Sequence, residues 1–161
     1  MGNSSRQCSQ APWLSSKRIV DDALELARKA HAGQVDKLGV PYIEHVLAVA
    51  SAVAHLGLNF EIVGLLHDSL EDCTDRSLVS MEILTERFGP EIAEAVAAMT
   101  KQPHEDYDTQ YLPRVMSNPI AAAVKRADVA HNKSRLHLLD PIARSRLAAK
   151  YSGFVTRFGD A

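Results

Sequence analysis

A chain of 161 residues is long enough to bury one hydrophobic core and short for two. Hydrophobic residues make up 46% of it and charged residues 24%, which excludes a disordered tail protein, a collagen-like repeat and a small disulfide-stapled scaffold. The formal charge of −2 provides no basic surface for a nucleic-acid polymer, although a nucleotide-sized ligand needs only a local positive patch.

The chain shows no sign of a membrane or secretory segment. Its apolar stretches are interrupted by charges before they reach the ~20 residues of a membrane span, so we expect no membrane partner. Residues 1–16 are polar and lack the apolar centre of a signal peptide; we expect them to form a disordered leader before a domain over 17–161. Cys8 and Cys73 are too few for a disulfide framework, which favours a reducing, cytoplasmic setting.

Apolar residues recur at helical spacing along most of the chain. In chain order, the spacing predicts helices over residues 17–32, 41–56, 59–71, 80–88, 90–99, 119–137 and from 141 onward. The residues expected to cap helix starts are Asn59, Ser80, Asn118 and Asp140. Gly33, Gly57 and Gly89 are expected to end helices.

Residues 101–113 differ from the helical segments around them. They hold three acids, two tyrosines and two prolines, which indicates a loop that covers a site. No segment alternates between apolar and polar residues as a half-buried strand does. The sequence therefore predicts an all-α, single-domain helical bundle.

The most informative feature is a histidine followed by three carboxylates. His67 and Asp68 come directly after an apolar run, and Glu71 and Asp72 follow each of them by four residues. On one helix, residues four apart share a face, so the four side chains form two adjacent stripes. Carboxylates gathered beside apolar positions destabilise the fold unless a positive charge lies between them, and a divalent cation would supply it.

Two further metal-ligand candidates fall on other predicted helices, His45 and Asp128. Each has an ordinary explanation, because a lone histidine is usually a packed or surface residue and Asp128 can pair with Lys125 three residues earlier. An acidic pair on a helix is likewise more often a solvated face. The combination of a histidine, a His-Asp pair and a distant aspartate on separate helices is what favours a metal site.

Five segments of the chain carry a resemblance to a known family. They are His31-Ala32-Gly33-Gln34, Pro41-Tyr42-Ile43-Glu44-His45, Leu65-Leu66-His67-Asp68-Ser69-Leu70-Glu71-Asp72, Phe88-Gly89 and Lys125-Arg126-Ala127-Asp128-Val129-Ala130-His131-Asn132. Together they resemble the HD superfamily of metal-dependent phosphohydrolases, with its pattern H…HD…D on an all-helical fold. Within that superfamily the chain is similar to the hydrolase domain of the RelA/SpoT-type alarmone enzymes, over roughly residues 20–155.

The resemblance implies a metal-dependent phosphohydrolase that removes the 3′ pyrophosphate of the alarmone (p)ppGpp. It implies one divalent ion, usually Mn²⁺, ligated by His45, His67, Asp68 and Asp128. It places Glu71 and Asp72 beside the ion as the catalytic acids that assist the attacking water. This agrees with the spacing, because side chains one turn beyond the ligands reach a nearby water.

Substrate contacts are expected from a second set of residues. The resemblance implies contacts from Asn132 and Tyr151. The basic candidates near the site are Lys37, Arg114, Lys125 and Arg126, of which at least half are expected to be ordinary surface charges. His31 is either a residue that supports the site or a packed helix histidine. Their substrate is expected to be a small nucleotide.

The loop after Gln34 departs from the family pattern. Alarmone hydrolases usually have several basic residues there, whereas this chain has Val35-Asp36-Lys37, and Val46 stands where proline is common after His45. The sequence therefore predicts an intact metal centre with an altered set of substrate contacts. Two alternatives stay open: the same chemistry on another nucleotide or phosphorylated cofactor, and a non-catalytic sensor of nucleotide or metal, which would have little need of Glu71 and Asp72.

Overall fold

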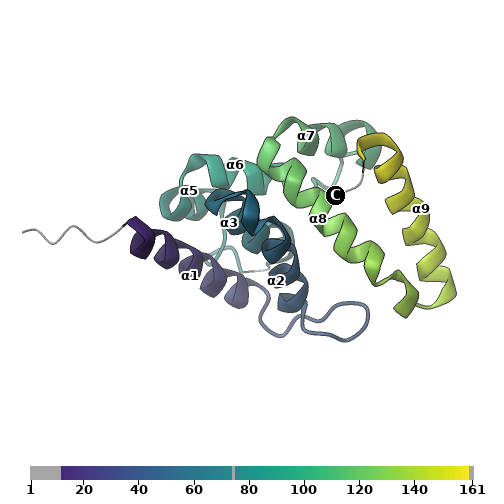
Figure 1. The fold of residues 1–161 in the computed structure, drawn as a ribbon, viewed down its shortest axis with the longest axis horizontal. Coiled ribbons are helices and arrows are strands. Elements are labelled where there is room, and N and C mark those ends of the chain that lie inside the picture. Colours follow the sequence, from purple (N-terminus) through teal and green to yellow (C-terminus); the bar gives the residue numbers. More distant parts are fainter. Residues whose placement is uncertain (1–11, 74, 160–161) are drawn as a thin grey trace, which may run out of the picture.

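The computed structural model describes residues 12–73 and 75–159, which fold almost entirely into helices (Figure 1). The helices are α1 Pro12–Ala30, α2 Tyr42–Val53, η1 Ala54–Leu56, α3 Leu58–Leu66, α4 Ser69–Asp72, α5 Met81–Phe88, α6 Pro90–Met99, η2 Tyr107–Tyr111, α7 Leu112–Ser117, α8 Pro119–Ser134, η3 Leu136–Leu138 and α9 Pro141–Phe158. The extended pairing within these residues is one isolated bridge between Val35 and Pro41. The all-α prediction is confirmed.

Most helix starts follow the capping residues that the sequence indicated. The side chains of Ser80, Asn118 and Asp140 each accept a hydrogen bond from a backbone N–H in the first turn of α5, α8 and α9. The expected cap at Asn59 is wrong, because α3 already begins at Leu58 behind Gly57. Helix α1 begins at Pro12 rather than at residue 17, and the first eleven residues of the expected leader lie outside the described residues.

The helix expected over residues 59–71 is broken at the His-Asp pair. Helix α3 ends at Leu66, and α4 starts again at Ser69. The Ser69 hydroxyl donates to the Leu66 carbonyl at 2.6 Å, so a side chain takes part in the hydrogen bonding that would otherwise continue the helix. His67 and Asp68 therefore lie on a turn, where both side chains can face the interior.

The predicted loop over residues 101–113 also contains helical structure. Tyr107–Tyr111 forms a π-helical turn that leads into α7. The Tyr111 ring is buried, and its hydroxyl donates to the Met99 carbonyl at 2.7 Å. Burial of this tyrosine explains why a segment with loop-like composition folds back on α6.

Helix α3 lies at the centre and packs against α1, α2, α6 and α8 (Figure 1). Its closest approach is to α2: a Cβ atom at Gly64 would lie 2.6 Å from the Ala50 Cα, so only glycine fits there. Buried residues such as Leu26, Ile62 and Leu66 fill the core around this crossing. The close packing fixes the end of α3, and with it His67, against α2.

Among the helices that the structure describes, none combines the length and the apolar character that a bilayer crossing requires.

Candidate metal centre and ligand pocket

The four predicted metal ligands come from three parts of the fold. His45 lies on α2, His67 and Asp68 on the turn after α3, and Asp128 on α8. Potential ligand atoms of His45, His67 and Asp128 all lie within 4.8 Å of one another, and the three side chains are buried. The Asp68 Oδ2 atom lies 3.0 Å from His67 Nε2 and 3.8 Å from His45 Nε2. The structure thus brings all four residues together.

Hydrogen bonds orient the two imidazole rings toward the carboxylates. His67 donates from Nδ1 to the Gly64 carbonyl at 2.8 Å, which leaves its buried Nε2 atom facing Asp68. The Nε2 atom of His45 lies 3.4 Å from Asp128 Oδ1, and its Nδ1 atom lies 2.8 Å from His131 Nδ1. In each ring, Nε2 therefore faces the carboxylates, while Nδ1 takes part in a hydrogen bond on the other side of the ring.

The carboxylates of the cluster are held by neighbouring donors. Tyr42 donates its hydroxyl proton to Asp68 Oδ2 at 2.6 Å, and burial next to this carboxylate raises the pKa of Tyr42 well above its usual range. Asp128 accepts from Lys125 Nζ at 2.8 Å and from the Asn132 side-chain amide. These contacts leave both carboxylates ionised and fixed in place.

The carboxylates of the cluster stabilise positive charge on their neighbours. Burial alone would lower the pKa of the His67 ring, yet Asp68 and Asp128 raise it to about 9. Burial also disfavours the ionised carboxylates, but His67 lowers the pKa of Asp68, and Lys125 does the same for Asp128. A field that favours a proton on a fully buried imidazole also favours a bound cation.

The donor set fits a divalent metal ion. Imidazole nitrogens suit ions such as zinc, iron and copper, and carboxylates suit ions such as manganese and magnesium. At His67 Nε2 no well-aligned hydrogen bond is formed within the described residues, so this nitrogen is available as a ligand. Two such nitrogens and two carboxylates, held rigidly from outside, therefore form a candidate site for one divalent ion.

The two predicted catalytic acids lie on α4, next to the cluster. Glu71 accepts from the Lys101 backbone N–H at 3.0 Å, which links α4 to the segment after α6. Burial and the nearby charges of Asp68 and Glu71 raise the pKa of Asp72 to about 6. Neither acid is part of the pocket wall described next.

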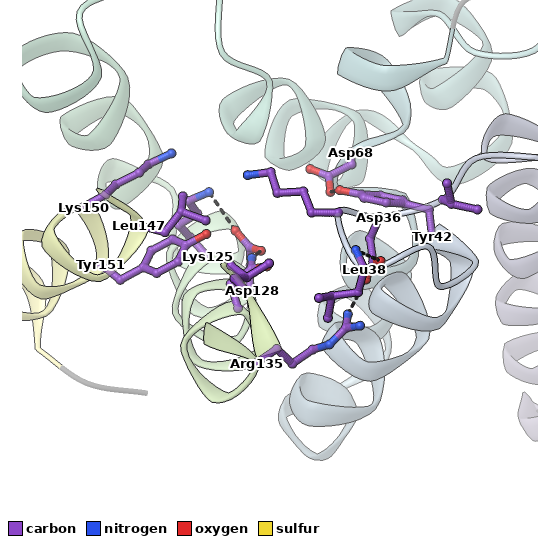
Figure 2. Close-up of a pocket in the computed structure, with 14 residues that line it drawn as sticks. Asp36, Leu38, Tyr42, Asp68, Lys125, Asp128, Arg135, Leu147, Lys150 and Tyr151 are labelled. Atoms are coloured by element: carbon purple, nitrogen blue, oxygen red, sulfur yellow. Dashed lines mark hydrogen bonds and ion pairs between the residues drawn. The ribbon is translucent and has the colours of Figure 1, made fainter. Parts of the chain in front are cut away.

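A pocket of about 410 Å³ opens beside the cluster, between the loop before α2 and helices α8 and α9 (Figure 2). Asp68 and Asp128 lie in its wall. All four residues predicted to bind substrate line it as well: Lys37, Lys125, Asn132 and Tyr151. Asp36 and Tyr42 add to the polar lining, as do Arg135 and Lys150, which the sequence did not single out.

Two of the four basic candidates do not line this pocket and serve other parts of the fold. Arg114 pairs with Glu105 at 2.6 Å and donates to carbonyls at the end of α6, such as that of Ala98. Arg126 donates to the Phe158 carbonyl at 3.3 Å, which ties α8 to the end of α9. Both arginines donate to backbone oxygens near helix ends, a role that depends on tertiary structure and has no signature in the sequence.

His31 is a buried residue behind the site. Its Nδ1 atom lies 2.8 Å from Gln34 Oε1, and its ring centroid lies 5.0 Å from that of Tyr42. Because Tyr42 holds Asp68, His31 packs against a side chain that orients a metal-ligand candidate. The structure thus favours the supporting role among the two alternatives for His31.

The chain is similar in sequence to proteins that are already known. A model of the HD domain matches residues 23–132. Over 140 residues the chain is 32% identical to a probable GTP pyrophosphokinase of Mycobacterium leprae, covering 81% of this chain and 17% of that one. Over 135 residues it is 37% identical to guanosine-3′,5′-bis(diphosphate) 3′-pyrophosphohydrolase of Haemophilus influenzae, covering 76% of this chain and 19% of that one.

The fold has a solved counterpart, described as a metazoan ortholog of SpoT that hydrolyzes ppGpp. The two structures align with a TM-score of 0.72 at 20% sequence identity, covering 87% of this chain and 85% of the other. The curated relatives are longer, and the chain spans less than a fifth of each of the two named above. The HD-domain match covers most of the described helices, including every metal-ligand candidate, and the chain therefore belongs to the HD domain family.

Proposed function

We propose that this chain is a metal-dependent phosphohydrolase that removes the 3′ pyrophosphate of guanosine 3′,5′-bis(diphosphate) and its pentaphosphate form, (p)ppGpp. The observation that carries the proposal is one opening in which a buried His/Asp cluster adjoins a pocket lined by lysines. The name of the Haemophilus influenzae relative gives this reaction, which supports the choice of substrate.

We propose Mn²⁺ as the ion, held by His45, His67, Asp68 and Asp128. When bound, such an ion supplies positive charge that polarises a phosphoryl oxygen and makes water easier to deprotonate. The chain's own contribution is orientation. Gly64, Tyr42 and Lys125 hold the ligand side chains before the ion arrives, so little conformational freedom is lost on binding.

Asp72 is the proposed proton acceptor. Its raised pKa of about 6 makes it a stronger base than an ordinary aspartate while leaving it mostly ionised at neutral pH. Water adds to the phosphorus next to the 3′ oxygen, Asp72 takes the water proton, and the bond from that phosphorus to the 3′ oxygen breaks. The departing 3′ oxygen takes a proton from solvent to become the 3′ hydroxyl of GDP, and Asp72 releases its own proton to solvent. Glu71, anchored to the Lys101 amide, adds negative charge beside Asp72 and so helps to keep its pKa high.

The pocket lysines are proposed to hold the phosphates. Lys37 projects from the loop before α2, Lys125 from α8 and Lys150 from α9, so positive charge reaches the pocket from three directions. Lys125 is already paired with Asp128. Lys37 and Lys150 are therefore the pocket lysines that we propose to pair with the phosphates. Asn132 and Tyr151 line the same pocket and are proposed to add polar contacts to the nucleotide.

We also propose that the protein works on small nucleotides in the cytoplasm. The buried Cys73 is a free thiol, as expected in a reducing compartment, which supports this location.

Product analysis tests the proposed function. Purified protein with Mn²⁺ is incubated with ppGpp, GTP and a 3′-phosphorylated nucleotide, and pyrophosphate and orthophosphate are measured separately. We expect GDP and pyrophosphate in equal amounts from ppGpp, and no product with Asp68→Asn, which keeps the shape of the ligand and removes its charge. Orthophosphate from another nucleotide would indicate a different phosphohydrolase. Nucleotide binding without any product would indicate a sensor.

A further inference from the structure

Asp36, the residue that departs from the family pattern, is paired with an arginine that the sequence did not single out. The Asp36 Oδ2 atom lies 2.7 Å from Arg135 Nη1, and both side chains line the pocket (Figure 2). Asp36 belongs to the loop before α2, whereas Arg135 directly follows α8. The acid therefore does not present an uncompensated negative charge to a ligand, as the sequence led us to expect.

The Asp36 carboxylate is fully engaged in building the loop. Its Oδ1 atom accepts from the backbone N–H groups of Leu38 at 2.8 Å and Val40 at 3.0 Å. Burial would raise the pKa of Asp36, but these two bonds and Arg135 outweigh burial and lower it. The carboxylate is therefore an ionised anchor, with one oxygen for the loop and the other for the guanidinium.

Arg135 is left with an unused donor edge. Its side chain is 25% exposed, and within residues 12–73 and 75–159 its ion-pair partner is Asp36. A guanidinium carries five N–H donors in a rigid fork, so one contact through Nη1 leaves most of them available. Asp36 fixes the plane of this fork at the edge of the pocket.

The position of Arg135 places it away from the metal centre. It follows Asp128 by seven residues, which corresponds to roughly 10 Å along a helix. Leu38 on the loop and Leu139 after η3 line the same pocket. A planar apolar group bordered by hydrogen-bond acceptors matches these surroundings, and a purine base at the far end of a nucleotide is such a group.

We propose that Arg135 determines base specificity by donating from its free edge to O6 and N7 of guanine, with Asp36 as the residue that positions it. Paired acceptors on guanine suit the fork of an arginine, whereas adenine presents an amino donor in place of O6. The inference rests on the proposed function for the nucleotide class. It adds the residue that selects the base, and it replaces the basic loop of the family with a cation from α8.

The competing explanation is that the ion pair serves only to hold the loop. Arg135→Lys separates the two, because lysine keeps the positive charge beside Asp36 but lacks the planar fork. Arg135→Ala removes both. Arg146→Ala is the matched control, since Arg146 lies exposed on α9 and does not line the pocket.

The experiment measures the dissociation constants of GDP and ADP for the four proteins by calorimetry, with melting temperatures alongside. A good two-point contact discriminates between bases by about 5- to 150-fold. We expect the wild type and Arg146→Ala to prefer GDP within that range. We expect Arg135→Lys and Arg135→Ala to lose most of the preference, and Arg135→Lys to keep the wild-type melting temperature.

Three results would overturn the inference: a wild type that binds GDP no better than ADP or not at all, an unchanged preference in Arg135→Lys, or an equal loss of GDP and ADP affinity. The last result would place Arg135 on the phosphates. Rates with guanosine and adenosine 3′,5′-bis(diphosphate) separate this failure from that of the proposed function. Hydrolysis of both without preference rejects only the role of Arg135, and base-selective binding without hydrolysis rejects only the enzymatic proposal.

Discussion

His45 and His131 face each other through the same ring atom: Nδ1 of one lies 2.8 Å from Nδ1 of the other. Such a contact needs a single shared proton. If His45 offers Nε2 to the cluster, its proton is on Nδ1, and His131 must accept with its own proton on Nε2. The second ring on α8 therefore fixes both the orientation and the tautomer of a metal-ligand candidate on α2.

We predict that His131→Ala weakens Mn²⁺ binding by about 10- to 100-fold, because a ligand that loses its outer hydrogen bond is less well oriented. His131→Asn should recover most of the affinity, since its side-chain oxygen can accept the same proton. His137→Ala is the control, because His137 is exposed and its side chain contacts the Ser134 carbonyl rather than the cluster. Calorimetric titration with Mn²⁺ measures all three, and wild-type affinity in His131→Ala would contradict this role.

The crossing of α2 and α3 provides a second prediction. Gly64→Ala forces a methyl group against the Ala50 backbone and shifts the carbonyl that holds His67, so we expect a loss of about 1–3 kcal/mol in unfolding free energy and weaker metal binding. Gly153→Ala on α9 meets no atom within 4 Å and should instead gain about 0.5–1 kcal/mol. Urea unfolding compares the two, and equal effects would mean that close packing at Gly64 is unimportant.

The sequence predicts those features of the fold that depend on contacts between residues close together in the chain. The caps at Ser80, Asn118 and Asp140 act within one turn, and each is confirmed. The pairing of Asp36 with Arg135 joins residues almost a hundred positions apart, and no local sequence pattern predicts it. The same holds for His131, whose partner is on another helix.

The candidate site shows the same difference between local features, which the sequence predicts, and long-range contacts, which it does not. The spacing of histidines and acids, joined with a family resemblance, located residues that the structure places in one cluster. Their roles as ligands and catalytic acids stay predictions. The break of the helix at His67 was missed, because it depends on the Ser69 hydroxyl and on Tyr42 holding Asp68. The sequence could not tell which basic candidates line the pocket, because an arginine at a ligand site and one that binds a helix end, such as Arg114 or Arg126, look alike in a sequence.

The raised pKa of Asp72 predicts a pH-dependent stability in metal-free protein. An acid whose pKa rises from 3.8 to about 6 on folding stabilises the fold below pH 4 and loses that contribution as the pH rises through 6. Asp72→Asn should therefore raise the melting temperature at pH 7.5 by about 2–4 °C, equivalent to about 1 kcal/mol or less after screening by solvent, and have little effect at pH 4.

Thermal unfolding in chelator at the two pH values checks this prediction. Saturating Mn²⁺ should shrink the gain at pH 7.5, because the ion neutralises the charges that repel Asp72. A gain that is the same at both pH values would show that repulsion between carboxylates is not its cause.

Lys125 and Asp128 form a largely buried ion pair, with side chains 13% and 11% exposed. Lys125→Met should cost about 3 kcal/mol in metal-free protein, because it leaves the Asp128 charge buried without its main partner. Lys29→Met breaks an exposed pair with Glu25 and should change nothing measurable. Mn²⁺ should restore part of the stability of Lys125→Met. Chemical unfolding with and without the ion measures this effect, and equal stability of the variant in both conditions would contradict the prediction.

The location of the ion tests the central claim most directly. Crystals grown with Mn²⁺ and measured at the manganese absorption edge should give one anomalous peak per chain, in contact with Nε2 of both His45 and His67 and with the Asp68 and Asp128 carboxylates. Asp68→Asn crystals should lose most of that peak. A manganese peak elsewhere, or none at the cluster while the protein is saturated in solution, would contradict the assignment of these four residues as the metal centre.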